Sequence, residues 1–119
     1  FISWLSNKDL KIYEKNFKIS GFKYPLLWYR SMLSKSERNR IIKLNLPSST
    51  LIPAMFMAGE SDWGIYQKPG DFEVMQNKFF KNLLDIIIIP RAGHWLQQEN
   101  PKSTFLSIKS FYKKIYNLK

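Results

Sequence analysis

Two ionisable residues, Asp62 and His94, follow two apolar runs of the sequence. His94, the only histidine, lies in IPRAGHWLQQENP (89–101), and Asp62 lies in AGESDWG (58–64). Imidazole is the side chain whose charge change falls nearest neutral pH, and a neighbouring carboxylate can hold its tautomer and stabilise its charged form. Such a pair would supply acid–base chemistry. The alternative is a histidine that is merely satisfied in a loop.

Two expected strands must deliver this pair. The apolar segment TLIPAMFMA (50–58) predicts a buried strand, with Pro53 near its start or on an edge. The segment DIIIIP (85–90) is too short and too β-branched for a helix, and predicts a second strand buried on both faces. In a parallel α/β sheet the carboxyl ends of the strands meet at one edge. We therefore expect Asp62 and His94 to lie side by side.

The first part of the sequence predicts helices. Ser6 is a favoured N-cap and Gly21 a favoured end for a first helix. A second, short helix is expected to start at Pro25, because proline is tolerated in a first turn. The polar, basic segment 34–49 is expected to form a helical turn plus a loop.

Two further helices are expected among the strands. One covers DFEVMQNKFFKNLL (71–84) with Asp71 as its cap, and the last is opened by Asn100 and Pro101. From residue 50 the order is strand, loop, helix, strand, loop, helix, which indicates the α/β class with a parallel sheet.

The chain divides into a helical segment, 1–49, and an α/β segment, 50–119. Two strands do not make a stable sheet, and Phe1 stands where an initiator methionine is expected. We therefore expect the C-terminal portion of a larger protein, and a fragment that has no activity by itself.

Composition limits the other functions. The 19 Lys and Arg residues outweigh the 9 Asp and Glu residues to give +10, but the lysines are spread along the chain, so we expect a solvated basic surface and no nucleic-acid partner. With no cysteine and one histidine, neither a disulfide nor a metal site is expected. The longest aliphatic run, IIII, is far too short to span a membrane. A cytoplasmic location is expected, and homo-oligomerisation is left open.

Three segments together resemble a known family. IPAMFMAGESD (52–62) and AGHW (92–95) are similar to the acid strand and histidine loop of α/β-hydrolases. SGFKYPLLWYRSM (20–32) resembles the cap (lid) domain of epoxide hydrolases in particular. The resemblance extends over about residues 4–116. It implies hydrolysis of a small apolar epoxide to a vicinal diol, with no cofactor.

The resemblance also implies roles for individual residues. Tyr29 would be one of two lid tyrosines that hydrogen-bond the epoxide oxygen, since a phenol is neutral at pH 7 and can donate to an alkoxide. An aspartate attacks the epoxide to form an ester, and His94, oriented by Asp62, then deprotonates the water that hydrolyses it. The nucleophile, the oxyanion-hole segment and the first lid tyrosine belong upstream of Phe1.

Three further side chains are candidates for lining the substrate pocket. Met32 lies one turn beyond Tyr29, and Trp63 and Trp95 flank the Asp–His pair, where they would form an apolar wall. The alternative is ordinary packing between cap and core, because both roles bury the same rings.

Other interpretations remain open. SDWG (61–64) resembles the family's nucleophile elbow, which needs small residues two before and two after the nucleophile; Gly64 fits but Glu60 does not, so Asp62 is favoured as the acid. A related haloalkane or haloacid dehalogenase would use the same triad logic. A non-catalytic remnant that binds polyanions is the alternative outside the enzymes.

Overall fold

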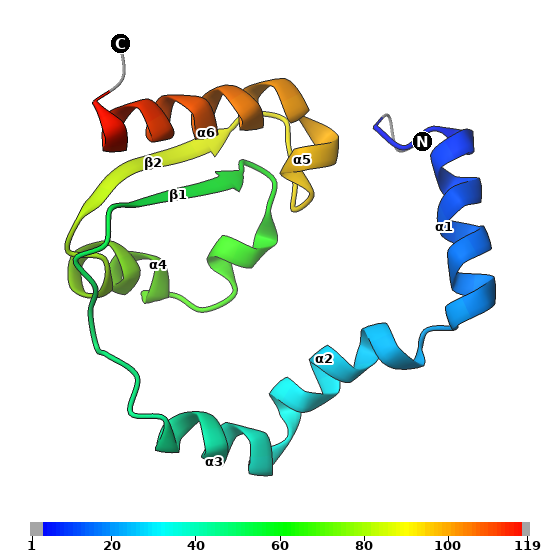
Figure 1. Cartoon of the computed structure of the whole chain (residues 1–119), viewed down its shortest axis with the longest axis horizontal. Helices are drawn as coiled ribbons and strands as arrows, with labels where there is room; N and C mark the ends of the chain where they lie inside the picture. The colour runs from blue at the N-terminus through cyan, green and yellow to red at the C-terminus, as the bar shows by residue number, and fades with distance from the viewer. Residues whose placement is uncertain (1–3, 118–119) are drawn as a thin grey trace. The chain divides into compact units, whose positions relative to one another are not determined.

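The computed structural model describes residues 4–117 and divides the chain into two units, one ending at Pro47 and the other starting at Ser48 (Figure 1). Each unit is described by itself. Phe1, the residue that suggested a truncated start, lies outside the described residues.

The first helix of the N-terminal unit has the predicted ends. Helix α1 covers Asn7–Ser20. The Ser6 hydroxyl accepts the backbone N–H of Asp9 at 3.2 Å, and the Asp9 carboxylate accepts the backbone N–H of Ser6 at 3.3 Å. This reciprocal capping box satisfies two N–H groups that have no partner within the helix. Gly21, with a φ of 63°, ends the helix in a backbone conformation that favours glycine.

The next two helices differ from the prediction in their bounds. Helix α2, Lys23–Leu33, begins two residues before Pro25, which the first turn tolerates because its missing N–H has no acceptor there. Helix α3, Lys35–Lys43, is longer than the predicted helical turn. Its sequence lacks an apolar stripe, but Lys, Glu and Arg are good helix formers.

The C-terminal unit contains the predicted parallel sheet. Strands β1, Ala54–Gly59, and β2, Leu83–Ile89, run parallel and pair so that their last residues, Gly59 and Ile89, are partners. Pro53 directly precedes β1, where it removes no hydrogen bond from the ladder. Because both strands end at the same level, the loops that follow them start side by side.

The helix predicted over 71–84 is shorter in the structure. Helix α4, Asp71–Val74, continues as the π-helical turn η2, Met75–Phe79. Leu83 and Leu84 belong to β2 instead. The prediction extended the helix over them because both suit a helix as well as a strand. The N-cap is Gly70 rather than Asp71.

Three further helical segments complete this unit. The 3₁₀ turn η1, Trp63–Tyr66, follows β1 directly, and the short helix α5, Leu96–Glu99, follows the histidine loop. The last helix, α6, covers Pro101–Tyr116, and the Asn100 side chain accepts the backbone N–H of Ser103 at 3.2 Å. The predicted start of this helix is therefore confirmed.

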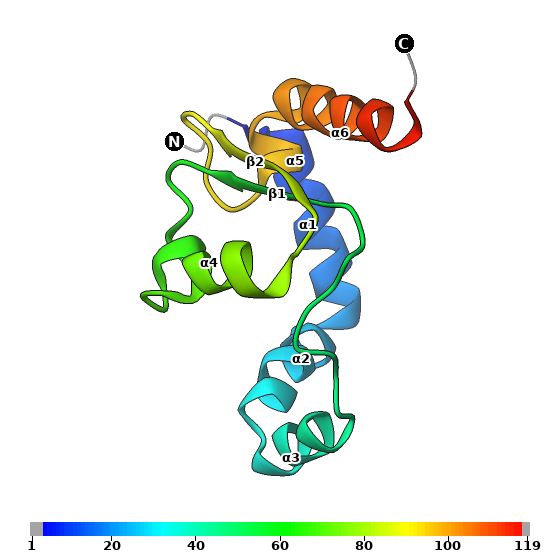
Figure 2. The same cartoon turned by 90° about the vertical axis from the view of Figure 1, so that its left-hand side faces the viewer.

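The elements of this unit form layers. Helix α6 lies along one side of the two strands and α4 along the other (Figures 1 and 2). On the α4 side, the ring of Phe56 packs edge-on against that of Phe72 with centroids 5.1 Å apart. A small core is formed by Ile89 at the end of β2 together with Ala92 and Leu96.

One face of β2 is uncovered in residues 4–117, as expected for two strands whose faces need partners that this chain does not contain. Leu84, Ile86 and Ile88 alternate along one face, and each is at least 40% exposed, since no described element covers them. None of the helices in the described range is long and apolar enough to cross a membrane.

Candidate functional site

The loops that follow β1 and β2 are joined through their backbones. The N–H of Glu60 donates to the carbonyl of Ile89 at 2.9 Å, and the N–H of Ser61 donates to the carbonyl of Ala92 at 2.9 Å. These bonds continue the parallel pairing past the strand ends. They bring the loop that carries Asp62 against the loop that carries His94.

Asp62 is held in the loop after β1 with an ordinary backbone. Its φ and ψ are −77° and 103°, and its Oδ1 accepts the N–H of Gly64 at 2.8 Å. The residue is only 8% exposed. A nucleophile elbow is a strained turn, and Asp62 shows no such strain.

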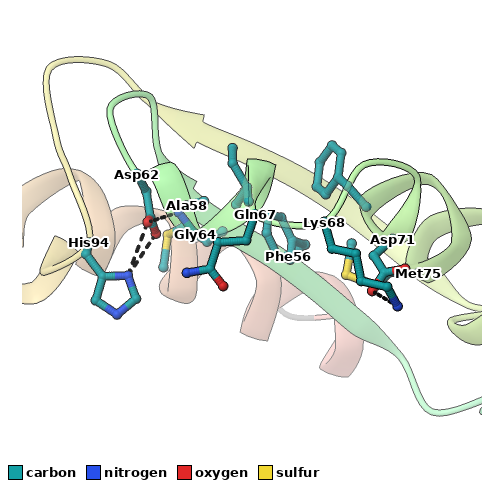
Figure 3. Close-up of a pocket in the computed structure, with 12 residues that line it drawn as sticks. Phe56, Ala58, Asp62, Gly64, Gln67, Lys68, Asp71, Met75 and His94 are labelled. Carbon is teal, nitrogen blue, oxygen red and sulfur yellow. Dashed lines mark hydrogen bonds and ion pairs between the residues drawn. The ribbon is translucent and has the colours of Figure 1, made fainter.

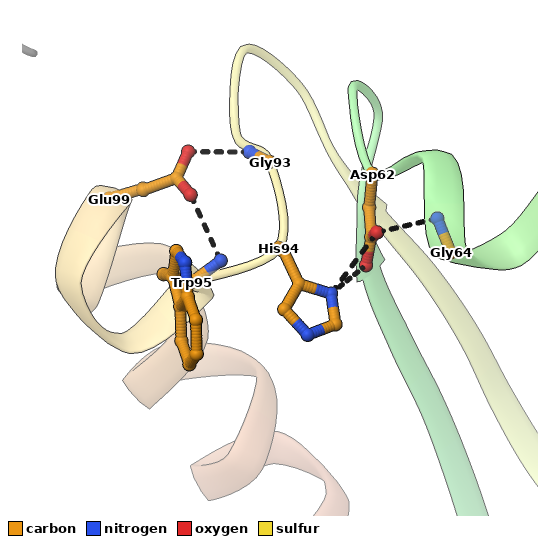
Figure 4. Close-up of polar contacts among 6 residues, drawn as sticks. All are labelled: Asp62, Gly64, Gly93, His94, Trp95 and Glu99. Atoms are coloured by element: carbon orange, nitrogen blue, oxygen red, sulfur yellow. Dashed lines mark hydrogen bonds and ion pairs between the residues drawn. The ribbon is translucent and has the colours of Figure 1, made fainter. Parts of the chain in front are cut away.

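The structure brings Asp62 and His94 together, as the strand-end argument predicts. The His94 Nδ1 atom lies 3.1 Å from Oδ2 and 3.2 Å from Oδ1 of Asp62 (Figure 4). A carboxylate only accepts hydrogen bonds, so Nδ1 carries the proton. In the neutral imidazole the other nitrogen, Nε2, is then unprotonated and available as a base. It points away from the carboxylate (Figure 4).

A second carboxylate, that of Glu99, accepts hydrogen bonds from the backbone on both sides of His94. It accepts the N–H of Gly93 at 2.6 Å and the N–H of Trp95 at 2.9 Å (Figure 4). We did not predict this role from the sequence, because a carboxylate that binds backbone N–H groups has no side-chain partner to reveal it. Its position five residues after the single histidine was the only available signal.

Asp62 and His94 open onto a cavity of about 620 Å³. Its apolar lining comes from β1 and from the α4–η2 segment. It includes Phe72 as well as Phe56 and Met75 (Figure 3). An ion pair between Lys68 and Asp71, 2.9 Å apart, lies on its wall. The cavity thus combines an acid–base pair with a mostly apolar surface, as ligand sites commonly do.

The other candidate residues lie elsewhere. Trp63 and Trp95 are both exposed and are not among the side chains that line this cavity, although the Trp95 ring meets the His94 imidazole edge-on at 5.1 Å. Tyr29 and Met32 are exposed on α2, in the N-terminal unit. Their roles toward a substrate stay predictions. Across the described residues, no three His, Asp or Glu side chains gather where they could hold a metal ion.

Comparison with known proteins confirms the resemblance. The chain is 30% identical to "Epoxide hydrolase 3" of Siraitia grosvenorii and 31% identical to "Epoxide hydrolase A" of Mycobacterium tuberculosis, over 94% and 92% of its own residues. These matches cover 35% and 32% of the relatives, so the chain spans about a third of their length. No family model matches the chain.

Solved structures give the same result. Potato (Solanum tuberosum) epoxide hydrolase I matches with a TM-score of 0.79 and 27% identity, over 94% of this chain and 35% of the potato chain. A variant of the Vigna radiata epoxide hydrolase matches with a TM-score of 0.78 and 26% identity, over the same shares of the two chains. The fold is that of the corresponding part of an α/β-hydrolase.

Proposed function

We propose that this chain, whose sequence and fold match epoxide hydrolases over nearly all of its length, supplies the acid–base pair that completes the hydrolysis of an epoxide to a vicinal diol. The observation that carries the proposal is the contact between His94 Nδ1 and the Asp62 carboxylate at the ends of two parallel strands.

The first chemical step opens the epoxide. A carboxylate oxygen of an aspartate attacks a ring carbon and forms an ester, while the ring C–O bond breaks and its electron pair stays on the epoxide oxygen. The Tyr29 hydroxyl donates a proton to that oxygen. Tyr29 is exposed on α2 and is not packed into a core among the described residues, which is compatible with this role.

The second step uses the pair described above. His94 Nε2 takes a proton from water, the resulting hydroxide attacks the ester carbonyl carbon, and the diol leaves as the acyl C–O bond breaks. The proton on His94 then returns to the departing alkoxide, and the proton of the aspartic acid released in this step restores the Tyr29 hydroxyl. Asp62 stabilises the imidazolium in between, because its carboxylate lies against the protonated Nδ1.

The nucleophilic aspartate is a residue outside these 119. Asp62 is poorly suited to the role because its carboxylate is nearly buried and already engaged by His94 and by the Gly64 N–H. Its unstrained backbone also differs from that of an elbow. These features support its assignment as the orienting acid.

The substrate would be a small, mostly apolar epoxide. Support comes from the apolar side chains that line the cavity beside the pair, among them Phe56 and Met75. Trp63 and Trp95 are exposed and follow Asp62 and His94 directly in the sequence, and Met32 lies one turn from Tyr29, so these three remain candidates for contacting the substrate.

The decisive experiment uses the longest reading frame that contains this chain. The purified protein is mixed with a styrene-oxide-type substrate, quenched at short times and examined by mass spectrometry for a covalent adduct. We expect diol formation, and accumulation of an aspartyl ester in the His94→Ala variant. Equal ester hydrolysis with and without the imidazole would overturn the proposal.

A further inference from the structure

The backbone on both sides of His94 donates hydrogen bonds to one carboxylate. From this geometry we propose that Glu99 is a positioning residue, which sets the direction of the His94 imidazole for ester hydrolysis. The inference rests on the proposed function, and it adds a residue to the two that make up the acid–base pair.

The hydrogen bonds of Glu99 enclose His94 in the sequence. One carboxylate oxygen accepts the N–H of Gly93 and the other accepts the N–H of Trp95, at 2.6 and 2.9 Å. Bonds from N–H groups to an ionised carboxylate are among the stronger hydrogen bonds in proteins. Since both peptide groups are tied to one planar group, the backbone of His94 between them has little freedom to turn.

Packing alone cannot provide this control. The His94 side chain is 60% exposed, so few neighbours restrict its ring. Its contact with Asp62 fixes one nitrogen, but the ring can keep that contact only if its Cα stays in place. Glu99 fixes the Cα through the flanking peptides.

The carboxylate is itself anchored to the core. Glu99 ends α5, whose first residue, Leu96, is buried. The buried Thr104 hydroxyl on α6 can donate a hydrogen bond to either of two carbonyls. That of Leu96 lies 3.0 Å away and that of Asn100 lies 2.8 Å away. The position of Glu99 is thereby set by the packing of α5 against α6.

Gly93 leaves room for the carboxylate. A Cβ added at Gly93 would lie 3.2 Å from both oxygens of Glu99, which is tighter than ordinary van der Waals contact. A methyl group there would push the carboxylate away while its charge and length stay unchanged. The Gly93→Ala substitution is therefore a second way to disturb the hydrogen bonds between Glu99 and the loop that carries His94.

A matched control exists on the same pair of loops. The Glu60 carboxylate accepts the N–H of Arg91 at 3.1 Å, which also joins the two loops but does not flank His94. Glu60→Gln and Glu99→Gln make the same chemical change. Glutamine replaces one of the two acceptor oxygens with an NH₂ group, which only donates, so it cannot accept one N–H group on each side-chain atom as Glu99 does.

The test measures the two chemical steps separately in the longest reading frame that contains this chain. We expect Glu99→Gln to slow ester hydrolysis about 10- to 100-fold, as small misplacements of catalytic groups do, and to leave ester formation unchanged. Glu60→Gln should leave both rates near those of the parent. If Glu99→Gln does not fold, Gly93→Ala is measured in its place, with the same selective loss expected.

The outcomes separate the two proposals. If His94→Ala stops ester hydrolysis but neither Glu99→Gln nor Gly93→Ala slows it beyond the Glu60→Gln control, the positioning role is wrong and the proposed function stands. A loss that affects ester formation equally would also overturn the positioning role. If His94→Ala leaves ester hydrolysis intact, the proposed function fails, and the role of Glu99 with it.

Discussion

Gly59, the last residue of β1, lies directly against Ala92 in the histidine loop. A Cβ on Gly59 would overlap the carbonyl oxygens of Ala92 and Gly93. The close approach lets the backbone of the two loops pair, which in turn brings Asp62 to His94. The absence of a side chain at Gly59 is therefore a condition for the site.

Gly59→Ala should destabilise the fold and damage the site together. The added methyl group meets backbone atoms, which cannot move aside as a flexible side chain could, and such overpacking costs about 1–3 kcal/mol. Urea unfolding would show a lower midpoint, and ester hydrolysis would slow. Gly21→Ala, at the end of α1, is the control: its methyl group meets no atom within 4 Å, but the φ of 63° strains an alanine there, so it should lower the urea midpoint and leave ester hydrolysis unchanged.

Asp62→Asn should slow ester hydrolysis by roughly a thousandfold or more, because the amide no longer favours the imidazolium and disturbs the tautomer of His94. Rapid-quench measurement of the ester would show it accumulating. Asp71→Asn is the matched control, since Asp71 lines the same cavity but pairs with Lys68. Similar rates for the two variants would argue against Asp62 as the acid.

Tyr29→Phe should slow ester formation, because it removes one donor to the epoxide oxygen. The loss of such a donor typically costs about 2.7–4 kcal/mol, and a second tyrosine would reduce the effect. Stopped-flow measurement of the first step decides this. Tyr24→Phe removes a hydroxyl from the same exposed helix and should have no effect; an unchanged rate in Tyr29→Phe would return that residue to a packing role.

Asn100→Ala should lower the free energy of unfolding by about 0.5–2 kcal/mol, because it removes the side chain that caps α6. The change is measured by urea unfolding of the same protein. Gln97→Ala, at an exposed position of α5, is the reference. A cost no larger than that of the reference would show that the cap contributes little.

The 119 residues alone should not hydrolyse an epoxide. Asp62 and His94 can activate water, but no nucleophile is held in line with the bond that breaks, and such positioning can contribute about 7–11 kcal/mol. Purified chain is assayed with a styrene-oxide-type substrate beside its His94→Ala variant. Turnover above that variant would mean that a nucleophile lies within these residues, with Asp62 the first to test.

The sequence predicted the parts of the fold in which pattern and geometry agree. Two short apolar runs, one followed by Asp62 and the other by His94, were enough to predict a parallel pair of strands and the meeting of these two residues. The start of α1 was predictable because Ser6 is a favoured N-cap and Asp9, three residues on, is an acidic residue suited to a first turn.

Other features have no such signature. The end of the helix at Phe79 was missed because Leu83 and Leu84 fit the period of a helix as well as a strand. Helix α3 was underestimated because it lacks an apolar stripe. Glu99 was missed because its partners are backbone N–H groups, which every residue but proline has, and only folding of the loop decides which of them it meets.

The backbone bonds between the two loops also govern how the Asp–His pair opens. The amide hydrogens of Glu60 and Ser61 are bonded to carbonyls of the opposite loop, so they can exchange with solvent deuterium only when the loops separate. That separation pulls Asp62 from His94 in the same event. The exchange rates of these two amides therefore report the lifetime of the assembled pair in the resting protein, with no substrate present.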